Sequence, residues 1–259
     1  MRFFINNLKN SGKVKVMVSE EDDEAIIVED GNGKYCVVFD PLDGSSNMNA
    51  GVNVGTIFGI YRVKEGSKGS ADDALRPGNE MVVAGYCMYG SSCNLVITTG
   101  QGVNGFTLDP AIGEFVLTHP DIRIPTRGKI YSVNEGNATY WDKPCKEYFH
   151  AIKFPSAESG RKPYSARYIG SMVADVHRTL LYGGIFAYPS DSKSKDGKLR
   201  ILYECFPMAF ILEQAGGRAT SGKERMLDVI PKGIHARSPI FLGSTEDVKE
   251  VEELYQKLS

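Results

Sequence analysis

Short runs of apolar and β-branched residues dominate the first half of the chain, and this pattern is typical of β-strands. Six such runs occupy residues 25–28, 35–39, 55–63, 81–89, 94–98 and 113–117. The second half alternates strand-like runs with helical patterns at residues 140–152, 171–181 and 207–215. Because sheets and helices bury their apolar faces against one another, this order predicts a layered α/β protein. The boundary between the two halves is expected near residues 121–129.

The composition excludes several classes of protein. With 259 residues, 42% of them hydrophobic, and a net charge of −2, the chain can bury a core but lacks the basic surface of a nucleic-acid-binding protein. No apolar run reaches the roughly 18 residues of a membrane span, and the first residues do not resemble a secretory signal. Five scattered cysteines without a CxxC pair argue against structural zinc or disulfides. We therefore expect a cytoplasmic protein with neither nucleic acid nor membrane as partner.

Two aspartates, Asp40 and Asp43, directly follow an apolar run in the stretch VVFDPLDGSSN. Ends of buried strands are where α/β sheets present ligand-binding groups, and a tight Pro-Leu turn between the aspartates would let both side chains face one point. Paired carboxylates suit Mg²⁺, and the following Gly44-Ser45-Ser46 offers backbone N–H groups to a phosphate. The dipeptides DP and DG are also common in ordinary turns, so the stretch alone leaves a structural role open.

A further carboxylate, Glu204, lies inside the apolar segment LRILYECFPMAFIL. An unpaired carboxylate is costly to bury, so we expect either a metal ion or an ion pair with Arg200 or Lys198 to neutralise it. The same two cations lie on one side of an extended segment, an arrangement that suits a phosphate. These features together favour metal-assisted phosphoryl chemistry on an anionic substrate.

Beyond these carboxylates, the chain resembles fructose-1,6-bisphosphatase of class I, in its plant and fungal cytosolic versions, over nearly its whole length. The most specific segments are VSEED (18–22), FDPLDGSSN (39–47), VGTIFGIY (54–61), LDPAIGEF (108–115), KIYSVNEG (129–136), YIGSMVADVHRTLLYGGIF (168–186) and GKLRILYE (197–204). The DPLDG element is shared with sedoheptulose bisphosphatases and, more loosely, with inositol monophosphatases. The later segments fit the fructose enzyme much better.

The resemblance implies a layered αβαβα sugar-phosphatase fold with two mixed sheets and helices between and outside them. It implies a metal-binding domain with part of an AMP site at residues 1–122 and a sugar-phosphate-binding domain at residues 123–259. The implied reaction is Mg²⁺-dependent hydrolysis of the 1-phosphate of fructose 1,6-bisphosphate to fructose 6-phosphate and phosphate. This reaction serves gluconeogenesis, sucrose synthesis or the Calvin cycle, and family members are homotetramers inhibited allosterically by AMP.

The resemblance also implies roles for single residues. Two or three Mg²⁺ ions, or Mn²⁺ in their place, would be bound by Glu20, Glu21, Asp40, Asp43, Glu204 and the carbonyl of Leu42. Catalysis would depend on Asp40, Asp43 and Glu21, which would help to activate the attacking water. The phosphate that leaves would be held by Gly44, Ser45 and Ser46, and the sugar with its other phosphate by Asn134, Tyr168, Tyr188, Lys198 and Arg200. Arg167 would reach into a neighbouring subunit's site, and Lys34, Tyr35 and Arg62 match part of the AMP site.

The chain departs from the family pattern at three places. Asn137 stands where animal members carry a tyrosine, so that phosphate contact is either lost or supplied by Tyr140. Family members carry roughly 75 residues ahead of the position that matches Met1, including other AMP-binding residues, and we expect the chain to respond weakly to AMP. Chloroplast forms carry a cysteine-bearing insertion that would fall between Arg62 and Tyr86, and the segment 64–79 of this chain contains no cysteine, which argues against thioredoxin-type control.

Two other functions stay open at this point. The first is a sedoheptulose-1,7-bisphosphatase, which shares the DPLDG element. The second is a truncated form with low activity that acts as a regulatory or assembly subunit, although the retained carboxylates argue against a purely structural role.

Overall fold

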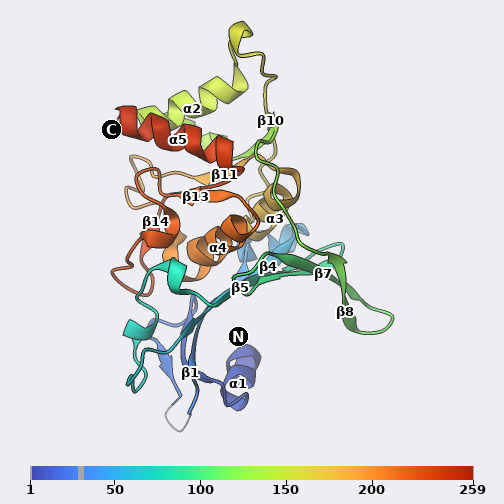
Figure 1. Ribbon diagram of the computed structural model, residues 1–259, viewed down its shortest axis with the longest axis vertical. Helices are drawn as coiled ribbons and strands as arrows, with labels where there is room; N and C mark the ends of the chain where they lie inside the picture. Colours follow the sequence, from blue (N-terminus) through green and yellow to red (C-terminus); the bar gives the residue numbers. More distant parts are fainter. Residues whose placement is uncertain (1, 29–31, 259) are drawn as a thin grey trace.

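The computed structural model describes residues 2–28 and 32–258, and it shows two large mixed sheets with helices between and outside them (Figure 1). This architecture confirms the predicted layered α/β fold. Within the described residues, no helix combines the length and the apolar character that a membrane crossing requires.

The larger sheet has eight strands in the order β2-β1-β3-β4-β5-β6-β7-β8. Their bounds are β1 (Val14–Ser19), β2 (Ile26–Ile27), β3 (Tyr35–Asp43), β4 (Val54–Arg62), β5 (Val83–Tyr89), β6 (Cys93–Thr98), β7 (Asn104–Asp109) and β8 (Glu114–His119). Only β1 and β3 run parallel, and the other pairs are antiparallel. The sequence did not predict β7, because its residues, NGFTLD, lack a continuous apolar pattern and most are only half-buried.

The second sheet has five strands in the order β10-β9-β11-β15-β13. They are β9 (Ile130–Ser132), β10 (Ser165–Ala166), β11 (Ile185–Tyr188), β13 (Arg218–Thr220) and β15 (Ile240–Gly243). Strand β9 is parallel to β10 and β11, whereas β15 is antiparallel to both of its neighbours. A separate ribbon pairs β12 (Leu199–Arg200) with β14 (Arg237–Ser238).

Five helices cover these sheets: α1 (Arg2–Asn10), α2 (Lys143–Lys153), α3 (Met172–Tyr182), α4 (Phe206–Gln214) and α5 (Thr245–Leu258). Helices α3 and α4 lie between the sheets, α2 and α5 cover the outer face of the smaller sheet, and α1 lies against the larger one (Figure 1). Residues 206–212 of α4 are all buried, because apolar side chains surround this helix and meet a sheet on either side.

Three apolar clusters correspond to these layers. The largest joins α3, α4 and the facing sides of both sheets, the second packs α2 and α5 on the smaller sheet, and the third packs α1 on β1 and β3. The side chains of β1 divide between two of them. Val16 and Val18 face the central cluster and Met17 faces α1, as alternation requires, whereas a register shift between Val14 and Val16 places Val14 on the side of α1 as well.

Candidate active site

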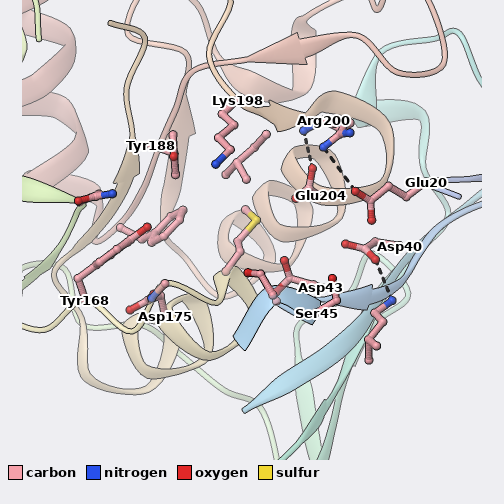
Figure 2. Close-up of a pocket in the computed structure, with 18 residues that line it drawn as sticks. Glu20, Asp40, Asp43, Ser45, Tyr168, Asp175, Tyr188, Lys198, Arg200 and Glu204 are labelled. Atoms are coloured by element: carbon pink, nitrogen blue, oxygen red, sulfur yellow. Dashed lines mark hydrogen bonds and ion pairs between the residues drawn. The ribbon is translucent and has the colours of Figure 1, made fainter. Parts of the chain in front are cut away.

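Asp40 and Asp43 lie at the end of β3, where a β-bulge directs both side chains to the same side of the strand (Figure 2). Asp40 pairs with Ile57 and Asp43 with Gly55, so three steps along β3 match two along β4. In a regular strand, residues three apart point to opposite faces, and the extra residue of a bulge reverses this relation. The tight turn predicted between the aspartates is therefore wrong, since β3 continues through them as a bulged strand.

Glu204 reaches the aspartates from a π-helical turn, Ile201–Cys205, that immediately precedes α4. One oxygen from each of Asp40, Asp43 and Glu204 lies within 4.8 Å of the others. All three side chains are buried, with exposed fractions of 2%, 6% and 5%. The chain thus brings together three carboxylates that are up to 164 positions apart in the sequence, from residue 40 to residue 204.

Each of these carboxylates accepts one backbone hydrogen bond that orients it. Leu42 N–H donates to Asp40 Oδ1 at 2.8 Å, and Arg200 N–H donates to Glu204 Oε2 at 2.6 Å. Val173 N–H, in the first turn of α3, donates to Asp43 Oδ2 at 2.8 Å. With their orientation fixed in this way, the carboxylates keep one oxygen each within 4.8 Å of the others, which is an arrangement that a bound cation requires.

Burial and mutual repulsion make these carboxylates unusually weak acids. Burial, followed by the charges of Asp43, Glu20 and Glu204, raises the pKa of Asp40 well above its usual range. Burial raises the pKa of Asp43 to about 6 and, with the charge of Asp43 as the next cause, that of Glu204 to about 8. Negative groups held together at such a cost are stabilised by a bound cation, so the cluster suits a metal.

The carboxylates border a cavity of about 300 Å³ that collects most of the residues implied by the family resemblance. Its lining includes Glu20, Asp40, Leu42, Asp43, Gly44, Ser45, Ser46, Asn134, Tyr168, Tyr188, Lys198, Arg200 and Glu204. Figure 2 shows Asp40, Asp43, Glu20 and Glu204 on one side of this cavity and Tyr168, Tyr188 and Lys198 on the other. The site therefore has an acidic side and a side with hydroxyl groups and a cation.

Two cations belong to this lining. Arg200 Nη1 lies 3.4 Å from Glu20 Oε1, so the predicted partner of Glu204 makes its side-chain ion pair with a different carboxylate. Lys198 Nζ lies 5.9 Å from the centre of the Tyr188 ring. Both are part of the extended segment around β12, as the sequence predicted, and both side chains reach the same cavity.

Gly44 allows the chain to turn sharply from β3 into the 3₁₀ turn Ser45–Ala50. Its φ of +79° lies in the left-handed region, and a Cβ atom there would lie 2.5 Å from Ser171 Oγ. The missing side chain lets the Gly44-Ser45-Ser46 segment lie directly beside the start of α3, along the cavity wall.

Several predicted residues lie elsewhere. Glu21 is exposed, and its N–H donates to Ser19 Oγ at 3.2 Å, whereas Arg167 is exposed beside β10; neither belongs to the cavity lining. Tyr35 and Arg62 lie opposite each other on β3 and β4 and line a separate cavity of about 720 Å³. The third AMP-site candidate, Lys34, is not among the residues that line this cavity.

The sequence interpretation missed Asp175, a fully buried carboxylate that lines the site. It accepts hydrogen bonds from Ser132 Oγ at 2.7 Å and from the backbone N–H groups of Ile169 and Gly170, so it orders the loop that carries Tyr168. The available signal was an aspartate within the apolar helical stripe at 171–181, the same signal that pointed to Glu204. Four other lining residues were also missed: Gly170, Met172, Phe186 and Leu199.

A layered α/β fold with a buried carboxylate cluster beside a lysine, an arginine and two tyrosines defines the class of sugar phosphatases. Two family models cover almost the whole chain: "Fructose-1-6-bisphosphatase, N-terminal domain" matches residues 2–120, and "Fructose-1-6-bisphosphatase, C-terminal domain" matches residues 124–256. The chain belongs to the fructose-1,6-bisphosphatase family, as the sequence analysis predicted.

Relatives in plants show the same membership. The chain is 64% identical over 253 residues to a protein of Solanum tuberosum named "Fructose-1,6-bisphosphatase, cytosolic". The aligned residues make up 97% of this chain and 74% of the relative. Proteins of the same name in Spinacia oleracea and Arabidopsis thaliana are 63% and 64% identical over 253 residues, with the same coverage.

Proposed function

We propose that this protein hydrolyses the 1-phosphate of fructose 1,6-bisphosphate, yielding fructose 6-phosphate and phosphate, with Mg²⁺ as cofactor. The observation that carries the proposal is the set of three buried carboxylates, with oxygens within 4.8 Å, beside a cavity lined by Lys198 and Arg200. The names of the relatives support the same substrate and reaction.

The donor set fits a hard divalent cation. Asp40, Asp43 and Glu204 offer only oxygen ligands, and Glu20 and the Leu42 carbonyl belong to the same cavity lining. Two or three Mg²⁺ ions, or Mn²⁺, are the proposed complement. When bound, such ions neutralise charge on the phosphoryl oxygens and on the oxygen that leaves.

The remaining groups of the site bind and orient the substrate. The backbone of the Gly44-Ser45-Ser46 segment is placed to receive the phosphate that leaves, close to the carboxylates. Lys198, Arg200 and the hydroxyl groups of Tyr168 and Tyr188 suit the sugar and its other phosphate, because charged donors form the strongest bonds with phosphate oxygens. Holding the two ends of the substrate fixes the ester bond relative to the attacking water.

Four further assignments complete the proposal. Asn134 binds the substrate from just beyond the end of β9, and Glu21 assists the attacking water. Arg167 serves a neighbouring subunit's site in a homotetramer, which agrees with its exposed position. Lys34, Tyr35 and Arg62 belong to an allosteric AMP site on the larger sheet.

The cytosol is the proposed location, because the relatives are named as cytosolic enzymes. These names support a role in gluconeogenesis or sucrose synthesis and do not support the Calvin cycle, which is a plastid pathway. They also favour the fructose substrate over sedoheptulose 1,7-bisphosphate.

The proposal is tested by measuring phosphate release from fructose 1,6-bisphosphate with Mg²⁺ and with EDTA. The wild-type protein should require Mg²⁺, and Asp43→Ala should abolish the activity, whereas Asp109→Ala, a change at the half-buried last residue of β7 and outside the cavity lining, should leave it unchanged. Full turnover by Asp43→Ala would refute the assignment. A clear preference for sedoheptulose 1,7-bisphosphate in a side-by-side assay would refute the substrate.

A further inference from the structure

A short chain of hydrogen bonds connects Tyr203 to the loop that follows β1. Tyr203 is fully buried in the π-helical turn, and its hydroxyl lies 2.7 Å from Nδ1 of His235. His235 Nε2 in turn lies 3.1 Å from the backbone carbonyl oxygen of Asp22. Because a carbonyl only accepts, Nε2 carries the proton, Nδ1 is the acceptor, and the Tyr203 hydroxyl is the donor.

The two ends of this chain lie next to the carboxylates of the site. Asp22 is two residues after Glu20, and Tyr203 directly precedes Glu204. The loop at residues 20–25 has no regular secondary structure, so a few contacts decide where Glu20 lies. The Arg200–Glu20 ion pair is one such contact, but both of its side chains are 27% exposed, which weakens it. The two hydrogen bonds through His235 are a second such contact.

We propose that His235 is a positioning residue that holds the loop with Glu20 at the distance from Glu204 that cation binding requires. The proposal rests on the proposed metal-dependent function of the site. His235 does not line the cavity, so it acts through Asp22 and Tyr203 and not by contact with the substrate.

The molecule contains a matched control for this contact. Tyr86 on β5 is also fully buried, and its hydroxyl lies 2.8 Å from Nδ1 of His177 on α3. The rings of both pairs meet edge to face, at centroid distances of 5.8 Å for Tyr86–His177 and 6.1 Å for Tyr203–His235. Neither Tyr86 nor His177 lines the site, so removing this bond tests the cost of losing a buried tyrosine–histidine bond by itself.

The experiment compares Tyr203→Phe with Tyr86→Phe in the full chain. Mn²⁺ affinity is measured by titration calorimetry without substrate, and the Tm is measured in EDTA. Both variants should have a Tm that is lower than the wild-type Tm by a similar amount. Only Tyr203→Phe should weaken Mn²⁺ binding, by about tenfold, the size expected when one hydrogen bond no longer orients the site.

A second pair of variants covers the case in which Tyr203→Phe does not fold. His235→Gln places an amide N–H near the position of Nε2 and should keep Mn²⁺ affinity within about threefold, whereas the shorter His235→Asn should lose about tenfold. In all variants the KM for fructose 1,6-bisphosphate should change less than the Mg²⁺ concentration needed for half-maximal activity.

The proposal is wrong if Tyr203→Phe and His235→Asn bind Mn²⁺ as wild type does, or if Tyr86→Phe weakens binding equally. Failure of the proposed function gives a different result: wild-type protein that binds Mn²⁺ but releases no phosphate from the sugar bisphosphate. In that case the binding data still decide whether His235 positions the cation site.

Discussion

Replacing Glu204 with glutamine should make the metal-free protein more stable at neutral pH while it impairs cation binding. In the folded chain, burial and the charge of Asp43 raise the pKa of Glu204 to about 8, from an ordinary value of 4.5. Glutamine keeps the size of the side chain and an oxygen that accepts the hydrogen bond from Arg200 N–H. It removes the acid that burial disfavours in its charged form.

The size of the effect follows from the two pKa values. A carboxyl group with a raised pKa in the folded state contributes its full stability below 4.5, and this contribution is lost as the pH rises toward 8. Between the two pKa values, each pH unit lowers the free energy of unfolding by about 1.36 kcal/mol. From pH 4.5 to pH 7 the wild type therefore loses about 3 kcal/mol of stability, and Glu204→Gln does not lose it. The side chain is only 5% exposed, so solvent screening reduces this value little.

The assay is urea unfolding in EDTA at pH 4.5 and at pH 7, repeated at pH 7 with Mg²⁺. The difference in free energy of unfolding between Glu204→Gln and wild type should grow by about 3 kcal/mol from the lower to the higher pH. With Mg²⁺ the wild type should gain stability and the variant should gain less. Glu147→Gln on the exposed face of α2 is the control. Its free energy of unfolding should stay within about 0.5 kcal/mol of the wild-type value at each pH. A difference that is the same at both pH values would refute the argument.

Three further changes test other parts of the structure. Gly44→Ala should lower the free energy of unfolding by about 2 kcal/mol in a urea titration, because alanine is strained at a φ of +79° and its Cβ would collide with Ser171 Oγ; Gly51→Ala, with a φ of +71° but open space around it, should lose less. Burial lowers the pKa of His177 to about 4 from 6.5, so its contribution to stability is full above pH 6.5 and is lost as the pH falls to 4, by up to about 3 kcal/mol. His177→Gln should flatten this part of the pH–stability curve, and an unchanged curve would contradict the assignment. Lys198→Met should raise the KM for fructose 1,6-bisphosphate about tenfold with a smaller change in kcat, and an unaltered KM in steady-state assays would exclude Lys198 from substrate binding.

Local patterns in the sequence predicted most of the elements of the fold. Runs of apolar and β-branched residues marked β4, β5 and β6 to within one or two residues and the start of β3, which continues four residues beyond the predicted run, and the helical stripes marked α3 and α4. Two of the missed elements have weak local signals. Strand β7 is only half-buried, and the π-helical turn before α4 reads locally as part of one apolar segment. A π turn depends on what packs around it, so local pattern alone does not reveal it.

For the candidate site, too, the sequence predicted single residues, and the tertiary structure showed how they come together. Glu204 was identified from the sequence because a carboxylate inside an apolar segment is costly unless something neutralises it, and Asp40 and Asp43 because they follow the end of a strand-like apolar run. The family resemblance implied that they share one site, but only the tertiary structure shows how they meet: through a bulge in β3, the N-terminus of α3 and the turn that carries Glu204. Asp175 was missed although the same local signal, a carboxylate within an apolar stripe, was available for it.

The order of residues in this chain therefore determined which segments become strands and helices and which acidic groups require a partner, because these properties arise from neighbours within a few positions. Only the folded chain decided which groups meet, that Arg200 pairs with Glu20 and not with Glu204, and that His235 joins two distant segments. Such pairings depend on how two sheets and the helices between them pack, and packing is a property of the whole chain.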